Sequence, residues 1–363
     1  IGIIIRSNLF RFWEAFLLDF RMKSEALVLK QKGKSNQAFE LQKIDLPILK
    51  QDEVMIESES FGLNYADVMA RNGMYKEAPP MPCVIGYEVV GVIIKAGSQV
   101  DQKIIGQRVL AFCRFGGYGR HIITKYEATH IIGELPSQEV LALCTQGVTA
   151  YYMTDVLSTI NKGDKVLVHA AAGGVGNILI QLAKRRGASV IAKVGTKEKE
   201  DFVRKLGADH VINYRDQDYE QEVRSFLNGV GLDISFNAVG GATFKKDMKL
   251  IGAGGRLFIF GGAALSNGKF GILSSLNFLR KMGLIIPAGL MMSSKSILGV
   301  NMLKIADYRP EVMKESLKWL IESYKKGELR VFVGGVFNSD QIAEAHELLE
   351  GGTSKGKISV RWV

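Results

Sequence analysis

The sequence predicts an α/β protein in which a β-rich domain precedes a doubly wound parallel sheet. Short β-like runs separated by glycine-bearing turns occupy residues 25–132, for example at 54–56 and 89–94. From Lys165 onward, short apolar runs alternate with amphipathic helices, which is the βαβ rhythm of a parallel sheet. The length of 363 residues also favours two domains over one.

The elements can be placed in order from this pattern. Residues 138–157 are expected to form a helix that leads into the second domain. The expected strands that follow are 166–169, 189–194, 210–212, 232–236, 256–260, 296–300 and a closing strand at 358–362. The expected helices are 175–186, 197–206, 217–227, 243–250, 311–326 and 341–350.

The composition is that of a soluble globular protein, with 47% hydrophobic and 23% charged residues. The net charge of +10 and the pI near 9.3 suggest a polyanion as partner. However, the lysines are scattered, and no stacking module or arginine-rich arm accompanies them. We therefore expect no nucleic acid as a main partner, because a basic enzyme with an anionic cofactor explains the charge.

Two further features concern the setting of the chain. Cys83, Cys113 and Cys144 contain no CxxC pair, which indicates reduced thiols in a cytoplasmic protein. Residues 1–22 form an N-terminal extension whose apolar stretches are too interrupted by charges for a membrane span. Because Met22 resembles a natural start, the preceding residues are interpreted as an upstream extension, with an amphipathic membrane-surface helix as the alternative.

The main functional signal is the stretch VLVHAAAGGVG at 166–176. A buried strand runs into a glycine turn, and a helix begins behind it. Gly173 lets the backbone approach a pyrophosphate, whose charge the helix N-terminus favours, and Gly176 lets helix and strand pack closely. Ala171 stands where the usual fingerprint has its first glycine. An ordinary tight turn is the alternative, but the flanking strands favour dinucleotide binding.

The end of the next strand indicates which dinucleotide is bound. NAD-binding units carry an Asp or Glu about 20 residues after the turn, to hold the ribose hydroxyls. Here Gly195 leaves room at the strand tip, and Lys197 and Lys199 follow in place of an acid. This pattern favours NADPH over NADH, because the lysines suit an extra phosphate. The alternative is that both lysines only solvate the start of a helix.

Several motifs together resemble the zinc-independent quinone oxidoreductase (zeta-crystallin) family of the medium-chain dehydrogenase/reductase superfamily. They are GLNYADVMARNGMY at 62–75, VIGYEVVG at 84–91, GVTAYY at 147–152, AAGGVG at 171–176 and KLGAD at 205–209. The resemblance covers nearly everything after Met22. The long segment 269–292 is similar to that of the vesicle amine transport protein branch.

The resemblance implies a GroES-like β-rich catalytic domain formed by residues 23–146 and 302–363. A Rossmann NADP-binding domain at 147–301 is expected between these two parts, with the active site in the cleft. A homodimer, formed by pairing of edge strands of the cofactor domains, is also expected from the resemblance.

The resemblance also assigns cofactor-binding residues. Thr149 is expected on the phosphate side, Gly173, Gly174 and Val175 at the pyrophosphate, and Gly195, Lys199 and Tyr214 at the adenosine phosphate, with Gly261 and Asn301 following later strands. Gly352 stands where some relatives have an Arg for the same phosphate. Lys355 or Lys357 is expected to substitute for it.

Zinc is not expected, because Asn64 and Tyr87 occupy the positions of the Cys and His ligands in zinc-dependent relatives. The five histidines form no tetrahedral site with the cysteines, and only His169, at a strand tip, merits attention. By resemblance, Asn64 contacts the nicotinamide end and Tyr75 lines the substrate cleft, where its hydroxyl can donate to a developing oxygen anion. Tyr75 as a buried structural residue is the alternative, and Met69 replaces a family aromatic.

The expected function is hydride transfer from NADPH to a quinone or an α,β-unsaturated carbonyl. The alternative is a membrane- or lipid-associated NADPH-binding protein with little turnover, because residues 269–292 mix apolar with basic side chains. In the first case this segment is a lid over the substrate, and in the second it lies weakly on an anionic membrane surface. The sequence does not select the individual substrate.

Overall fold

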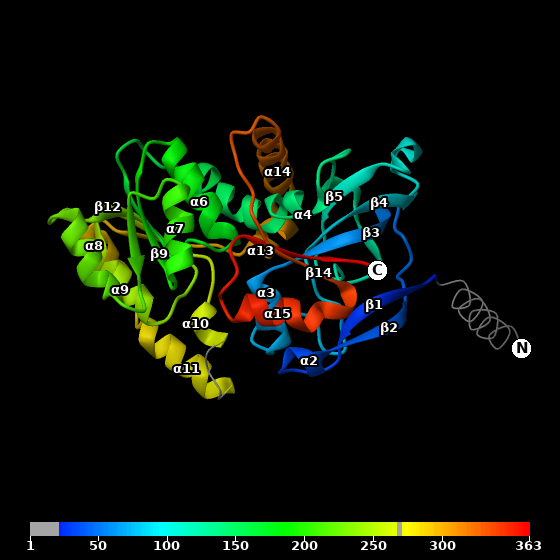
Figure 1. Ribbon diagram of the computed structural model, residues 1–363, viewed down its shortest axis with the longest axis horizontal. Helices are drawn as coiled ribbons and strands as arrows, with labels where there is room; N and C mark the ends of the chain where they lie inside the picture. Colours follow the sequence, from blue (N-terminus) through cyan, green and yellow to red (C-terminus); the bar gives the residue numbers. More distant parts are fainter. Residues whose placement is uncertain (1–21, 267–270) are drawn as a thin grey trace, which may run out of the picture.

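Two β-sheets form the two halves of the molecule, which lie side by side in Figure 1. The structure is a computed structural model that describes residues 22–266 and 271–363. The expected extension 1–22 therefore lies outside the described residues except for Met22, as do the first two residues of the segment 269–292. Among the described residues, no helix is long and apolar enough to cross a membrane.

The first half contains a mixed sheet in the order β14-β15-β3-β4-β5-β7, with β6 pairing a second part of β3. The last strands of the chain complete this sheet, because β15 runs antiparallel to β3 and parallel to β14. A separate hairpin, β1-β2, lies beside it. The strands are β1 (Lys23–Leu29), β2 (Phe39–Asp45), β3 (Glu53–Leu63), β4 (Glu88–Ala96), β5 (Arg108–Phe112), β6 (His121–Lys125), β7 (Thr129–Ile131), β14 (Val333–Asn338) and β15 (Lys357–Arg361).

The second half contains a parallel sheet in the order β10-β9-β8-β11-β12-β13, which confirms the predicted doubly wound sheet. The direction of winding reverses between β8 and β11, and ligands of such sheets bind at this point, beyond the carboxyl ends of the strands. The strands are β8 (Lys165–Val168), β9 (Ser189–Val194), β10 (His210–Asn213), β11 (Leu232–Asn237), β12 (Ile251–Ile259) and β13 (Ser296–Gly299).

Most helices lie where the apolar periodicity predicts them, but the single helix expected at 138–157 is divided into α4, α5 and two π-helical segments, and α2, α3, α10 and α13 were not predicted. The helix α3 has only seven residues, and what starts it is a capping box between Asn64 and Asp67 rather than an apolar stripe. The helices are α2 (Ser35–Ala38), α3 (Tyr65–Arg71), α4 (Ser137–Val140), α5 (Val148–Tyr151), α6 (Gly174–Arg185), α7 (Lys197–Lys205), α8 (Tyr219–Leu227), α9 (Ala242–Leu250), α10 (Ala263–Ser266), α11 (Gly271–Met282), α12 (Pro287–Ser293), α13 (Met302–Tyr308), α14 (Pro310–Lys325) and α15 (Ile342–Glu350).

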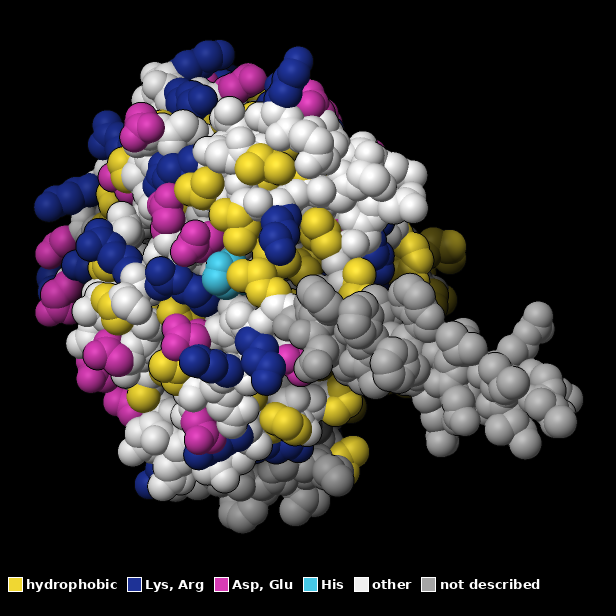
Figure 2. Space-filling model, turned by 90° about the vertical axis from the view of Figure 1, so that its right-hand side faces the viewer, with side chains coloured by type: hydrophobic (Ala, Val, Ile, Leu, Met, Phe, Trp, Pro, Cys, Tyr) yellow, Lys and Arg dark blue, Asp and Glu magenta, His cyan; other side chains and the backbone are white. Residues whose placement is uncertain are grey.

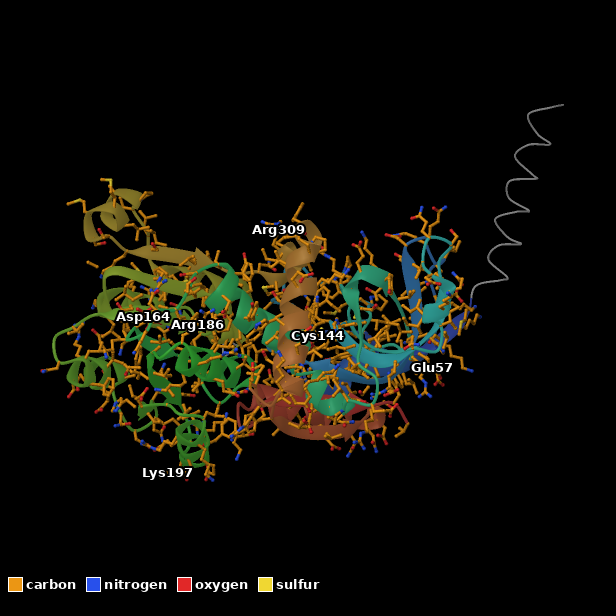
Figure 3. The ribbon with its side chains drawn as sticks, turned by 90° about the horizontal axis from the view of Figure 1, so that it is seen from above. Glu57, Cys144, Asp164, Arg186, Lys197 and Arg309 are labelled. Carbon is orange, nitrogen blue, oxygen red and sulfur yellow. The ribbon has the colours of Figure 1, made fainter. Side chains whose placement is uncertain are left out.

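One apolar core extends across both halves. It joins Tyr87 and Leu110 of the first half to Ile178 and Phe236 of the second, and Leu320 of α14 belongs to it as well. In Figure 3, α14 lies between the halves, next to the labelled Cys144. Because apolar side chains are shared, the halves are held together by the same burial that stabilises each of them. The exact domain limits at 146/147 and 301/302 stay predictions.

Candidate active site

The glycine turn after β8 is packed too closely for side chains. A Cβ at Gly176 would lie 2.4 Å from the carbonyl oxygen of Ala170, and one at Gly174 would lie 1.9 Å from Oε1 of Gln146. Gly173 is the N-cap of α6, so the free N–H groups of this helix face out of the turn. Such a turn fits a pyrophosphate.

Several buried polar atoms near the turn have no partner among the described residues. They include Oε1 of Gln146, which lies beside Gly174, Oδ1 of Asn177 in the first turn of α6, and Oγ1 of Thr145, the chain neighbour of Gln146. Thr149 lies one helical turn further on, and its hydroxyl donates to the Thr145 carbonyl oxygen at 2.6 Å. An unpaired buried polar atom is costly, and a ligand at the turn would supply the missing partner. Gln146 and Thr145 could not be predicted from the sequence, because neither belongs to a local motif.

Three cations gather where the adenosine end of a dinucleotide is expected. Burial lowers the pKa of Lys199, and the charges of Arg215 and Lys355 lower it further. The Lys199 ammonium donates to the Gly352 carbonyl oxygen at 2.6 Å. Next to them, a Cβ at Gly195 would lie 2.8 Å from the hydroxyl of Tyr214. Positive charges held together in this way favour an anion, and Arg215 was not predicted.

Asn64, which is expected at the nicotinamide end of the cofactor, lies next to a buried ion pair between Lys357 and Glu88. Asn64 joins the pair: its Nδ2 donates to Oε1 of Glu88 at 2.8 Å, and its Oδ1 accepts from the Lys357 ammonium at 3.1 Å. Lys357 was expected as a substitute cation at the adenosine phosphate, and this expectation is wrong. The register of β15 against β3, in which Ile358 faces Leu63, carries Lys357 into the core of the first half instead.

Tyr75 lies half-buried at the edge of both core clusters. Its ring meets that of Tyr87 edge-on, with 6.4 Å between centroids. Burial raises the pKa of Tyr75 to about 12, with a further contribution from Glu77, so its hydroxyl is protonated at neutral pH and can donate. Tyr87 packs on Phe115, whose backbone has a φ of 88°, a strained conformation of the kind that clusters at functional sites.

The remaining predicted cofactor-binding residues, which are Gly261, Asn301 and Val175, differ in what their neighbours indicate. A Cβ at Gly261 would lie 2.5 Å from the Ala238 carbonyl oxygen, so a close backbone approach accounts for this glycine. Asn301 is the N-cap of α13, and its Oδ1 accepts from Leu303 N at 3.1 Å. A structural role therefore explains Asn301 as well as cofactor binding does. Val175 is half-buried in the first turn of α6.

The histidine singled out by the sequence is part of a buried network. His169 Nε2 lies 2.9 Å from Asp247, which also accepts from Ser235, Asn237 and Tyr219. Because both carboxylate oxygens of Asp247 have hydrogen-bond partners, we interpret this network as a structural one. Within residues 22–266 and 271–363, no group of three His, Cys, Asp or Glu side chains is placed to hold a metal ion.

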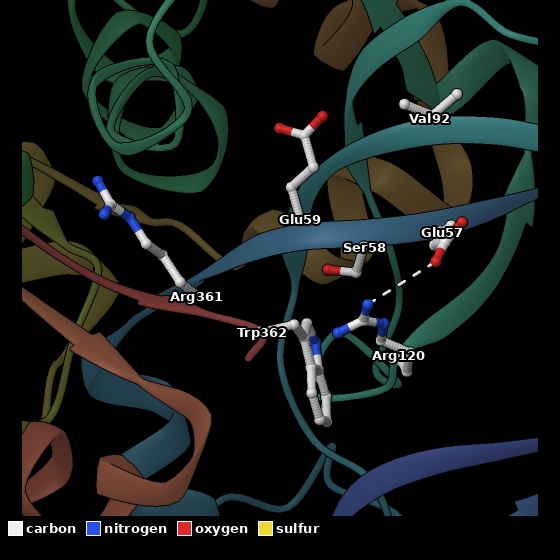
Figure 4. A pocket seen from close by; sticks show the side chains of 7 residues that line it. All are labelled: Glu57, Ser58, Glu59, Val92, Arg120, Arg361 and Trp362. Atoms are coloured by element: carbon white, nitrogen blue, oxygen red, sulfur yellow. Dashed lines mark ion pairs between the residues drawn. The ribbon is translucent and has the colours of Figure 1, made fainter.

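One groove on the surface lies away from the predicted site. Figure 4 shows a shallow groove beside the end of β15, lined by Glu57, Ser58, Glu59, Val92, Arg120, Arg361 and Trp362. It contains none of the predicted site residues. On the end of the molecule seen in Figure 2, basic and acidic side chains are interspersed, so this face offers no broad positive surface for a polyanion.

Comparison with known families decides the family of the chain. Residues 50–154 match the alcohol dehydrogenase GroES-like domain, and residues 174–322 match the zinc-binding dehydrogenase family. The chain belongs to the medium-chain dehydrogenase/reductase superfamily. This confirms the predicted resemblance and the predicted combination of a GroES-like with a Rossmann domain.

Relatives within the medium-chain dehydrogenase/reductase superfamily are distant. The zebrafish (Danio rerio) synaptic vesicle membrane protein VAT-1 homolog is 29% identical over 86% of this chain, which spans only 64% of that protein. A 2-haloacrylate reductase from Burkholderia sp is 28% identical over 93% of this chain and 98% of its own length. The human (Homo sapiens) quinone oxidoreductase is 27% identical over 87% of this chain and 91% of its own length.

A solved structure of a mycobacterial protein complexed with NADPH has the same fold. Its TM-score is 0.79 at 26% identity, and the match covers 93% of this chain and 99% of that one. The likeness therefore extends over both halves of the molecule.

Proposed function

We propose that this member of the superfamily is an NADPH-dependent reductase that works without zinc and reduces a quinone or an α,β-unsaturated carbonyl. The observation that carries the proposal is that three groups of residues suited to the parts of a dinucleotide occur together in this fold. Lys199, Arg215 and Lys355 gather at one end, the glycine turn lies in the middle, and Asn64 and Tyr75 lie in the other half.

The cofactor part rests on charge and space. The N-terminus of α6 and the glycine turn would hold the pyrophosphate, and the three cations would hold the additional phosphate that distinguishes NADPH from NADH. The mycobacterial neighbour complexed with NADPH supports this choice. When bound, NADPH supplies a hydride, and the protein positions it and excludes water.

The catalytic part rests on Asn64 and Tyr75. The Tyr75 hydroxyl would donate a hydrogen bond to the oxygen on which negative charge develops as hydride reaches the acceptor. Independence from zinc is supported by Asn64, which occupies the position of a zinc ligand in zinc-dependent relatives. Its side chain is hydrogen-bonded to Glu88 and to the positively charged ammonium of Lys357. A 2-haloacrylate reductase and a quinone oxidoreductase among the relatives support the two substrate classes.

The first test is a titration of the purified protein with NADPH and with NADH, followed by turnover assays. We expect NADPH to bind at least about tenfold more tightly, since one charged contact contributes roughly 1.5–3 kcal/mol. We also expect NADPH oxidation with 1,4-naphthoquinone or an enone such as 1-octen-3-one, unchanged by a chelator. Equal affinities would refute the cofactor choice, and NADPH binding without turnover of either acceptor would refute the reductase.

A second candidate function follows from exposed apolar side chains on α11 and α12. Leu276 and Leu279 are 58% and 61% exposed, whereas Phe278 of the same helix packs over Gly240. Leu284 and Met292, 92% and 84% exposed, continue this surface. Apolar patches of this kind mark interaction sites, and here they accompany Arg280 and Lys281 on a VAT-1-like chain. We propose weak association with an anionic membrane as the alternative to a lid.

In the expected homodimer, a second copy of the chain could cover the same apolar surface. The strand β13 is one of the two edge strands of the parallel sheet, and α12 precedes it directly. Edge strands with open hydrogen-bonding groups tend to pair. Sizing and co-sedimentation with phosphatidylserine vesicles, both on wild type and on Leu284→Glu, separate the cases. Loss of the dimer supports pairing, loss of vesicle binding supports the membrane, and a monomer that binds no vesicles refutes both. The cytoplasmic location stays a prediction.

A further inference from the structure

Lys357, Glu88 and Asn64 form a closed hydrogen-bonding arrangement in the core of the first half. Lys357 and Glu88 are 0% exposed and Asn64 is 6% exposed. An ammonium group has three donors, and those of Lys357 reach three acceptors: Leu63 O at 3.0 Å, Asn64 Oδ1 at 3.1 Å and Oε1 of Glu88. None of its protons remains for a substrate.

This arrangement fixes the orientation of the Asn64 amide. A lysine ammonium only donates, so the amide oxygen must face Lys357, and an ionised carboxylate only accepts, so the amide nitrogen must face Glu88. One N–H of the nitrogen is used by Glu88. The other has no hydrogen-bond partner among the described residues.

The same pair is tied to both segments of the expected cofactor site. Gly356, next to Lys357, donates its N–H to the Ala172 carbonyl oxygen at 3.0 Å and forms a bridge with Gly173. The second oxygen of Glu88 accepts from Thr145 N at 2.6 Å, in the helical segment that carries Thr149. A displacement of either segment therefore moves the groups that hold Asn64.

Stability alone does not explain the pair. Desolvation of two buried charges costs about as much as their attraction returns, and well-packed apolar residues in their place are often neutral or stabilising. We propose that Lys357 and Glu88 are positioning residues, which lock the Asn64 amide with one N–H directed at the nicotinamide end of the cofactor. This inference rests on the proposed function and names residues of the same site.

The test separates binding of the nicotinamide end from binding of the adenosine end. Affinities are measured for NADPH and for 2′,5′-ADP, which lacks the nicotinamide half. The proteins compared are wild type, Lys357→Met/Glu88→Leu, Asn64→Ala and the variant that combines all three substitutions. The double variant removes both charges while keeping the volume. We expect it to fold and to bind NADPH about tenfold more weakly, with 2′,5′-ADP changed less than about twofold. Adding Asn64→Ala should weaken NADPH no further.

A matched control is Arg71→Met/Glu350→Leu, which removes another ion pair with a buried cation, between α3 and α15. It should leave the ratio of the two affinities unchanged. Equal losses of NADPH and 2′,5′-ADP in the test variant, or additive losses with Asn64→Ala, would overturn the positioning role. Because the titrations need no turnover, this result is independent of the substrate class. A wild-type chain that binds neither nucleotide would instead refute the proposed function, and the inference with it.

Should the double variant not fold, Glu88→Gln replaces it. The glutamine keeps the shape of the side chain, but its NH₂ group meets either the Asn64 nitrogen or Thr145 N as a second donor. The expected result is the same selective loss of NADPH affinity, and the same outcomes contradict it.

Discussion

Replacement of Gly62 by alanine is expected to lower the free energy of unfolding by roughly 3 kcal/mol or more, the cost of disrupting a buried ion pair. A Cβ at this position would lie 2.4 Å from Cε of Lys357 and 2.5 Å from Oε1 of Glu88. Both side chains are fully buried and have no free space into which to withdraw. The methyl group must therefore separate the two charges or push β15 away from β3.

Urea denaturation of the two forms measures this effect. Gly289→Ala is the matched control, because a Cβ there has no heavy atom within 4 Å and the position lies in the helix α12. Alanine is a better helix former than glycine by about 1 kcal/mol, so this variant should equal or exceed wild type. If Gly62→Ala were as stable as the control, the close approach of Lys357 and Glu88 to this glycine would be refuted.

The sequence predicted the parallel sheet well because its signals are local. Each strand of this sheet is a short apolar run, and α6 shows its apolar stripe within twelve residues. The order of elements in one βαβ unit was enough to predict the residues around the glycine turn. It was also enough to predict Gly195 and Lys199 at the tip of the next strand. Those predictions needed no knowledge of distant contacts.

The surroundings of Asn64 could not be predicted in this way. Lys357 and Glu88 are 269 residues apart, and only the pairing of the last strand with β3 brings them together. Glu88 was visible in the motif at 84–91 but carried no assigned role, and Lys357 was placed at the wrong end because its order in the chain does not show the register of β15. Arg215 was missed for a related reason: its charge matters only because the fold brings it near Lys199 and Lys355, which belong to other segments of the chain.

Removal of Lys199 and Arg215 is expected to abolish the preference for NADPH. Each charged contact to a phosphate contributes roughly 1.5–3 kcal/mol, so Lys199→Ala/Arg215→Ala should weaken NADPH at least about a hundredfold. NADH, which lacks this phosphate, should change less than about threefold. Lys197→Ala is the matched control, because the Lys197 side chain is 74% exposed and pairs with Glu200 at 3.3 Å. Equal losses for both dinucleotides would place the phosphate elsewhere.

The pH dependence of binding gives a second, independent readout of the same site. Burial and the neighbouring charges of Arg215 and Lys355 lower the pKa of Lys199 in the free protein, whereas a bound phosphate favours the charged ammonium and raises it again. Binding therefore takes up a proton as pH approaches the lowered pKa, and NADPH affinity should fall as pH rises through that pKa. Lys199→Ala should remove that fall. If the NADPH affinity of Lys199→Ala fell with pH as much as that of wild type, the titration would belong to a group other than Lys199. The protonation of Lys199 is linked to binding only if its ammonium contacts the phosphate.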